Sequence, residues 1–211
     1  MPVFKSGQRF APAWCEMTVF EIIACPAGQR RAFARTAPKE KWIVARGDCR
    51  IKVGAEEIRA TAGTNLDLPS GDGGFEVLET TSGTTLIRMC GHWGNELGGS
   101  GIFRVVSSAE RGDGGDPVSY PKTTHFDNHY HDCDEYWILF QGRGTAVSEG
   151  RSYEVGPGDC VATQMGHHHD FPTVIEPVQA VFFETTLKGR KRLGHLWEHT
   201  HGPAQPPDDR A

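Results

Sequence analysis

Apolar residues occur along this chain in short runs separated by glycine, proline, asparagine and aspartate. Short runs rich in β-branched and aromatic side chains and bounded by turn residues predict β-strands. Their spacing is typical of an all-β barrel or sandwich. Between them, Gly142–Gly144 predicts a turn and Gly98–Gly101 a loop. The predicted strands are residues 19–24, 42–45, 49–53, 66–68, 85–89, 102–106, 136–140, 145–148, 160–163 and 179–185.

The composition narrows the possible partners. With 26 Gly and 13 Pro in 211 residues, long helices are not expected, and the net charge of −5 offers no basic surface for a nucleic acid backbone. The chain shows neither a secretory signal nor an apolar run of membrane-spanning length. We therefore expect a cytoplasmic monomer or homodimer that acts on a small molecule, without nucleic acid or membrane partners.

The sequence contains a weak internal repeat. A shift of 95 residues pairs Glu40 with Glu135 and Trp42 with Trp137, and it also pairs turn glycines such as Gly142 with their counterparts. Because these matches fall at corresponding strand boundaries, they predict two copies of one β-unit. The boundary between the copies is expected within residues 91–100.

The second copy carries the residues with metal chemistry. His129 and His131 are two positions apart, so on a strand both imidazoles project from one face. Glu135 could add a carboxylate oxygen, and one of the three histidines of the run 167–169 could complete the set. Three imidazole nitrogens and one carboxylate suit one divalent transition metal ion, with Fe, Mn, Co, Ni and Zn all possible.

These residues resemble the two motifs of the cupins. His129, His131, Glu135 and Gly142 fall on the first motif, G-x5-H-x-H-x3,4-E-x6-G, without its leading glycine. Gly166 and His169 fall on the second motif, G-x5-P-x-G-x2-H-x3-N, in which Gln164 replaces the proline and Thr173 the asparagine. The resemblance implies a double-stranded β-helix, or jelly-roll barrel, and selects as metal ligands His129, His131, Glu135 and His169.

The repeat makes the chain similar to two-lobed bicupins, with two tandem cupin lobes. In the first copy, Ala34 and Thr36 stand where the repeat places the motif histidines, and only Glu40 persists. The resemblance implies a degenerate, metal-free lobe over residues 1–95 and a metal-binding lobe over residues 96–188. Residues 189–211 are expected to form a C-terminal tail with solvent-facing histidines.

The fold alone does not determine a reaction, because cupins carry out several chemistries. The favoured hypothesis is a metal-dependent isomerase or epimerase of a sugar or other hydroxy-carbonyl compound, with His125, His167 or Glu184 moving the proton. One alternative is an iron-dependent dioxygenase, for which the same ligands suffice. The other is a non-catalytic cupin that binds a small molecule.

Overall fold

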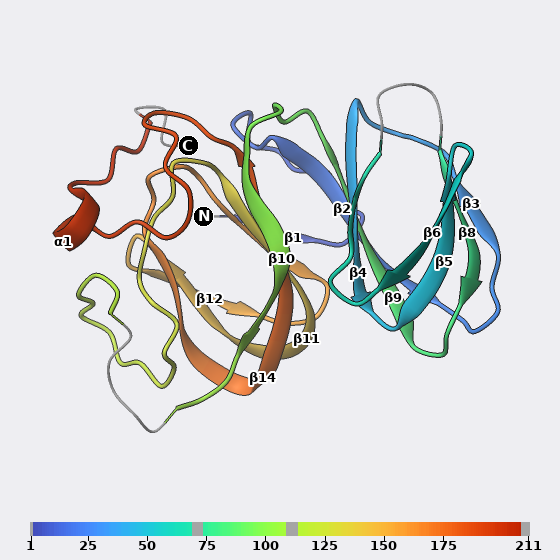
Figure 1. Ribbon diagram of the computed structural model, residues 1–211. Helices are drawn as coiled ribbons and strands as arrows, with labels where there is room; N and C mark the ends of the chain where they lie inside the picture. The colour runs from blue at the N-terminus through green and yellow to red at the C-terminus, as the bar shows by residue number, and fades with distance from the viewer. Residues whose placement is uncertain (1, 69–73, 109–113, 208–211) are drawn as a thin grey trace. The chain divides into compact units, whose positions relative to one another are not determined.

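The computed structural model describes residues 2–68, 74–108 and 114–207, and the regular structure in these ranges is almost entirely antiparallel β-sheet (Figure 1). The chain forms two compact units. Residues 6–11 and 16–93 make the N-terminal unit, and residues 1–5, 12–15 and 94–211 make the C-terminal unit. Within the described ranges, no helix has the length and apolar character needed to cross a membrane.

Two four-stranded sheets build the N-terminal unit. One has the strand order β2 (Met17–Cys25), β9 (Thr84–Gly91), β4 (Lys39–Arg46) and β7 (Asn65–Asp67). The other has the order β3 (Arg31–Phe33), β8 (Phe75–Thr80), β5 (Asp48–Val53) and β6 (Glu56–Thr61). Apolar residues from both sheets form one core that includes Trp42, Ile51 and Phe75. Burial of these faces stabilises the unit.

A six-stranded sheet forms the C-terminal unit, together with one short helix, α1 (Glu198–His201). The strand order is β1 (Val3–Lys5), β13 (Asp159–Thr163), β11 (Glu135–Ser148), β14 (His169–Thr186) and β10 (Leu97–Val105), and β12 (Arg151–Val155) pairs with β11. The long strands β11 and β14 pair along almost their whole length. Their inner faces supply a core that includes Trp137, Leu139 and Phe171.

Two glycine-rich segments differ from the sequence prediction. Gly142 and Gly144 form no turn but lie within β11, where the register with β14 shifts. Gly142 has φ of 76°, and a Cβ there would lie 2.1 Å from the carbonyl oxygen of Pro177, so only glycine fits this bulge. Gly98–Gly101 forms no loop either but belongs to β10. There, glycine leaves room for the large side chains of the neighbouring β14.

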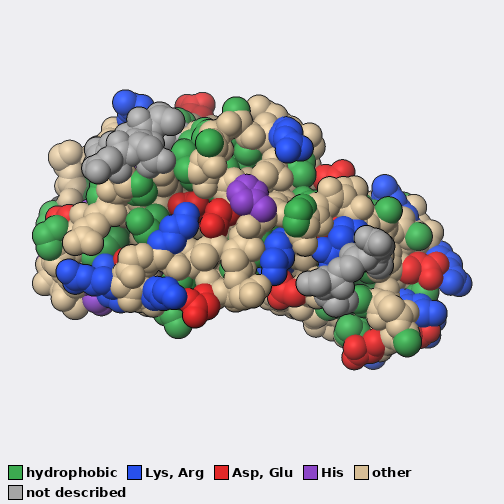
Figure 2. Space-filling model, turned by 90° about the horizontal axis from the view of Figure 1, so that it is seen from above, with side chains coloured by type: hydrophobic (Ala, Val, Ile, Leu, Met, Phe, Trp, Pro, Cys, Tyr) green, Lys and Arg blue, Asp and Glu red, His purple; other side chains and the backbone are tan. Residues whose placement is uncertain are grey.

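The surface carries both signs of charge. On the face shown in Figure 2, Lys and Arg side chains are interspersed with Asp and Glu side chains. Such mixing creates no extended field of one sign. It gives a polyanion no continuous basic track on this face.

Candidate metal centre

The two histidines of the His-x-His motif lie on an extended segment beside the start of β14. The backbone N–H of His129 donates to the carbonyl of His169 (3.2 Å), and the N–H of His169 donates back to the carbonyl of His129 (2.9 Å). This pairing places their side chains next to one another, with ring centroids 4.4 Å apart. Because side chains alternate along an extended chain, His131 returns to the same face, 4.8 Å from the ring of His129.

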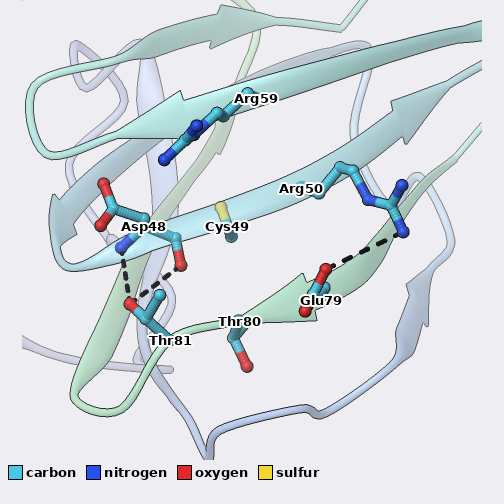
Figure 3. Close-up of a pocket in the computed structure, with 7 residues that line it drawn as sticks. All are labelled: Asp48, Cys49, Arg50, Arg59, Glu79, Thr80 and Thr81. Carbon is cyan, nitrogen blue, oxygen red and sulfur yellow. Dashed lines mark hydrogen bonds and ion pairs between the residues drawn. The ribbon is translucent and has the colours of Figure 1, made fainter.

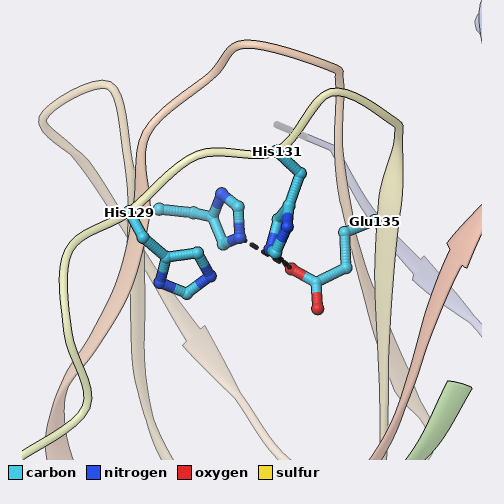
Figure 4. A group of neighbouring side chains, drawn as sticks. His129, His131 and Glu135 are labelled. Carbon is cyan, nitrogen blue, oxygen red and sulfur yellow. Dashed lines mark hydrogen bonds and ion pairs between the residues drawn. The ribbon is translucent and has the colours of Figure 1, made fainter. Parts of the chain in front are cut away.

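Glu135, the first residue of β11, completes the cluster. It shares a strand face with Trp137, which packs into the core, so its carboxylate points inward as well. Its Oε2 lies 2.6 Å from Nε2 of His169 and 3.3 Å from Nε2 of His131. Figure 4 shows His129, His131 and Glu135 pointing toward a common centre. The structure thus brings together the four side chains that the motifs predict, all buried and with ligand atoms within 4.8 Å of one another.

Each of the three imidazoles holds its Nδ1 against a backbone carbonyl oxygen. A carbonyl can only accept, so each Nδ1 carries the proton and each Nε2 presents a lone pair in the neutral ring. Contacts of this kind orient the histidine ligands of metal sites. In the order His129, His131 and His169, the carbonyls belong to Asp127 (2.8 Å), Gly194 (3.0 Å) and His167 (2.9 Å).

The electrostatics of the cluster favour a cation at its centre. Burial, together with the neighbouring imidazoles, holds the pKa of His129 well below its ordinary value. Burial alone would raise the pKa of Glu135, but the imidazoles of His131 and His169 outweigh it and hold that pKa well below its usual range. Burial would lower the pKa of His131, but the Glu135 carboxylate outweighs it and raises that pKa. Glu135 is therefore an ionised acceptor inside the protein, and it attracts positive charge.

The hydrogen-bond inventory supports a metal ion in this position. Nε2 of His129 and Nε2 of His131 are buried without a hydrogen-bond partner. Nε2 of His169 lies 2.6 Å from a carboxylate oxygen of Glu135, a contact that either a proton on the imidazole or a shared cation can bridge. A buried acceptor left unpaired costs about 1–3 kcal/mol. One divalent cation satisfies all of these atoms, and a set of three nitrogens and one oxygen suits a transition metal.

Glu184 is the proposed proton-transfer residue that lies against this cluster. It faces Glu135 across the β11–β14 pair, and its Oε1 lies 3.8 Å from Nδ1 of His131. Burial, and to a lesser degree the charge of Glu135, raises the pKa of Glu184. A Cβ at Gly98 of β10 would lie 2.5 Å from Oε2 of Glu184 and 2.9 Å from Sγ of Cys133. The glycine therefore leaves the space that the Glu184 carboxyl occupies.

The other two proposed proton-transfer residues lie in different surroundings. His125 is exposed, and its Nε2 is hydrogen-bonded to the hydroxyl of Ser108. His167 is half-buried and contributes its backbone carbonyl to His169. The third histidine of the run, His168, is engaged elsewhere, with Nε2 3.0 Å from a carboxylate oxygen of Asp116. The side chain of Glu184, by contrast, lies 3.8 Å from the side chain of the proposed ligand His131.

Residues 188–202, here called the C-terminal strap, pack along the metal-ligand segment. Tyr130 and Leu196 exchange two backbone hydrogen bonds of 3.0 Å, and the guanidinium of Arg192 binds both oxygens of Asp132 (2.9 and 3.0 Å). Tyr130 and Asp132 alternate with the ligand histidines, so they face away from the metal position and toward the strap. No local sequence pattern marks the Arg192–Asp132 contact, because its partners are 60 residues apart.

The N-terminal unit holds a cation of its own. The guanidinium of Arg88 binds both carboxylate oxygens of Glu40 (2.7 and 3.2 Å), the hydroxyl of Thr36 (3.0 Å) and the carbonyl of Ala34 (2.7 Å). The repeat pairs these three residues with His129, His131 and Glu135. A side-chain cation therefore takes the place that the repeat would assign to a metal ion.

A pocket of about 380 Å³ in the N-terminal unit has no comparable set of ligands (Figure 3). Arg50 lies 3.9 Å from Glu79, and the backbone of Asp48 is bonded to Thr81. Burial raises the pKa of the Cys49 thiol to about 11, so this thiol is not a nucleophile at neutral pH. The residues that line this pocket therefore indicate no reaction.

Comparisons with known proteins agree with this architecture. No family model matches the chain. The uncharacterized protein y4oW of Sinorhizobium fredii is 45% identical over 204 residues, which cover 97% of this chain and 94% of that protein. Among solved structures, the protein PA5104 of Pseudomonas aeruginosa matches with a TM-score of 0.58 and 13% identity, over 87% of this chain and 88% of that one.

Two further solved structures match at similarly low identity. An IolB-like protein of Salmonella typhimurium gives a TM-score of 0.56 with 12% identity, over 94% of this chain and 97% of that one. Protein Ylba of E. coli gives 0.50 with 12% identity, over 81% and 77%. These likenesses concern the fold alone. The fold is all-β, and its buried histidine and glutamate side chains could bind a metal. The chain belongs to the same family as y4oW.

Proposed function

We propose that this protein is a metal-dependent isomerase or epimerase of a small hydroxy-carbonyl compound such as a sugar. The observation that carries the proposal is the convergence of three Nε2 lone pairs and an ionised carboxylate, each oriented by the surrounding backbone, with Glu184 beside them. A divalent transition ion bound there would supply Lewis-acid polarisation of a substrate carbonyl and its neighbouring hydroxyl.

The protein's own residues would then handle the proton. Glu184 is buried, and burial raises the pKa of its carboxyl above the ordinary value, which suits a group that accepts and returns a proton. In the proposed isomerisation, Glu184 takes the proton from the carbon next to the carbonyl and returns it to the carbonyl carbon, while the hydroxyl proton of the substrate moves to the former carbonyl oxygen. In an epimerisation, Glu184 takes the same proton and a water molecule on the opposite face supplies the returning one. The carbonyl of Gly194 orients the imidazole of His131. Because His131 lies 3.8 Å from Glu184, it fixes the distance between the metal ligands and this carboxyl.

Solvent-deuterium incorporation tests this proposal. Metal-loaded protein is incubated in D₂O with a panel of aldoses and ketoses, and deuterium at the exchanged carbon is followed by NMR. We expect His131→Ala to lose both metal and exchange. Glu184→Gln should keep the metal but exchange about 10²–10⁴-fold more slowly. A metal-loaded wild-type protein that exchanges no proton of any panel member contradicts the proposal.

A second candidate, an iron-dependent dioxygenase, is favoured by aromatic side chains against the ligands. The ring of Trp137 lies 5.1 Å from that of His169, and the ring of Phe126 lies 5.8 Å from that of His129. Apolar walls suit a hydrophobic ring substrate. Oxygen uptake by the iron-loaded protein separates the candidates, because turnover by an iron-free preparation without O₂ eliminates the dioxygenase.

A further inference from the structure

The C-terminal strap places one imidazole directly over the metal ligands. The ring of His195 stacks on that of His129, with centroids 3.7 Å apart and planes 4° from parallel, and its centroid lies 5.4 Å from that of His131. The side chain of His195 is 42% exposed, whereas those of His129 and His131 are buried. His195 therefore stands between two metal ligands and the solvent.

Asp127 fixes the orientation of this ring. Nδ1 of His195 lies 3.0 and 3.1 Å from the two carboxylate oxygens of Asp127, and the indole N–H of Trp197 donates to the same carboxylate at 2.8 Å. A carboxylate accepts hydrogen bonds, so Nδ1 of His195 is the protonated nitrogen. The other nitrogen, Nε2, is on the far side of the ring from Asp127.

Asp127 thus orients two imidazoles in the same way, by accepting a hydrogen bond from Nδ1 of each ring. The backbone carbonyl of Asp127 receives Nδ1 of the buried His129, and its side-chain carboxylate receives Nδ1 of the exposed His195. Both rings therefore direct Nε2 away from Asp127. Stacking on His129 requires only a flat ring and does not determine which ring nitrogen faces Asp127. The hydrogen bond to Asp127 places Nδ1 of His195 there.

We propose that His195 is a substrate-contacting residue whose Nε2 accepts a hydrogen bond from a hydroxyl of the small molecule bound at the metal centre. The ligand class is a compact molecule with adjacent oxygen donors, such as a hydroxy acid or hydroxy-carbonyl compound. One oxygen binds at the ion and another reaches His195. Asp127 and Trp197 are positioning residues for this contact. This inference rests on the proposed function. It adds His195 as a residue that determines which small molecule binds at the metal centre.

The test uses the full-length protein loaded with Co²⁺, whose visible spectrum reports both metal loading and ligand binding. Glycolate, the smallest molecule with a hydroxyl next to a carboxylate, is the probe. His195→Phe keeps a flat ring for stacking but removes both nitrogens, and His195→Gln keeps a polar group near the position of Nε2. The matched control is His199→Phe, because His199 lies in the same strap but bonds to Asp116 (2.7 Å).

We expect His195→Phe to bind glycolate about tenfold more weakly than wild type, the loss of one hydrogen bond. Its Co²⁺ affinity should change less than about twofold, His195→Gln should recover part of the glycolate affinity, and His199→Phe should bind glycolate normally.

Three results overturn the inference. Unchanged glycolate affinity in His195→Phe, or no glycolate binding by Co²⁺-loaded wild type, contradicts the proposed substrate contact but not the proposed metal centre. A tenfold loss of Co²⁺ affinity in His195→Phe makes this residue a support of the metal instead. A wild-type protein that binds no Co²⁺ overturns the proposed function, and the inference with it.

Discussion

Glu40 of the N-terminal unit is 2% exposed, and its hydrogen-bond partners keep it ionised. Burial alone would raise the pKa of this carboxyl, but hydrogen bonds from Arg88 and Thr36 outweigh it and hold the pKa below its ordinary value. The guanidinium in turn is buried, so each charge depends on the other. Pairs of this kind add little net stability over apolar residues, but removing one partner leaves an uncompensated buried charge.

Arg88→Met should therefore destabilise the N-terminal unit by about 3–5 kcal/mol, measured by urea unfolding at pH 7. The control is Arg50→Met, because Arg50 is 54% exposed and its carboxylate partners lie at 3.7 and 3.9 Å. Pairs so exposed contribute about 0–1 kcal/mol. Equal effects of the two substitutions would contradict a special role for Arg88.

The same pair predicts a dependence on pH. A carboxyl whose folded-state pKa is depressed contributes stability that is present above its unfolded pKa and is lost as pH falls toward the folded value. For Glu40 the ordinary value is 4.5. The difference in unfolding free energy between wild type and Arg88→Met should thus be present at neutral pH and shrink as the pH falls through about 4.5 toward the lower folded-state pKa of Glu40. A difference that grows with acid would refute this assignment.

For single residues, the sequence predicts those contacts that form between residues close together in the chain. His129 and His131 are two apart on an extended segment, so their shared face follows from strand geometry. The carbonyl that orients His131 comes from Gly194, 63 residues away, and no local pattern marks it. Arg88 was missed for the same reason, because its partner Glu40 is 48 residues distant.

Among the strands, β10 packs against the side chains of β14 through its glycines. Gly98 and Gly99 are adjacent, yet a Cβ at Gly98 would lie 2.5 Å from Oε2 of Glu184, whereas a Cβ at Gly99 would come no closer than 3.4 Å to any atom. Gly98→Ala should therefore displace the Glu184 carboxyl, destabilise the unit by about 1–3 kcal/mol and slow proton exchange. Gly99→Ala is the matched control. Thermal unfolding and deuterium exchange measure both, and similar behaviour of the two variants would count against the proposed placement of Glu184.

The C-terminal strap offers a second test at this scale. Arg192 binds Asp132, which is adjacent to the ligand His131, and Gly194 two residues later orients that ligand. Arg192→Met should loosen the strap and weaken Co²⁺ binding by about 10–100-fold, as loss of a contact that orients a ligand does. Lys191→Met removes the same charge from the same turn, but Lys191 pairs with Glu96 at the surface. Competitive Co²⁺ titration should separate the variants, and equal affinities would show that the strap does not support the site.

The strands themselves were predicted unevenly. Alternating or continuous apolar runs gave most of the strands, including the start of β11 and the end of β14. Five strands in the described part of the chain were not predicted: β1, β3, β6, β8 and β12. Glycine was the source of two further errors, at Gly98–Gly101 and Gly142–Gly144. In isolation glycine indicates a turn, but here it allows close approach of a neighbouring strand, a tertiary requirement that the local sequence does not record.

For the whole molecule, metal binding should stabilise one unit selectively. The four proposed ligands all belong to residues 94–211, while residues 6–11 and 16–93 have a separate core that contains none of them. A ligand that binds only the folded state at 100 times its Kd adds about 2.7 kcal/mol. Co²⁺ should thus slow amide hydrogen exchange in the C-terminal unit and leave the core of the N-terminal unit unchanged, as followed by mass spectrometry.

Two controls make this outcome specific to the histidine cluster. EDTA should reverse the protection, and Mg²⁺ should not produce it, because Mg²⁺ prefers oxygen ligands to imidazole. His129→Ala should lose the response to Co²⁺, since the remaining nitrogens and carboxylate form an incomplete site. Protection that spreads equally over strands β2 to β9, or that Mg²⁺ produces as well, would mean that the ion binds elsewhere or stabilises the chain without these ligands.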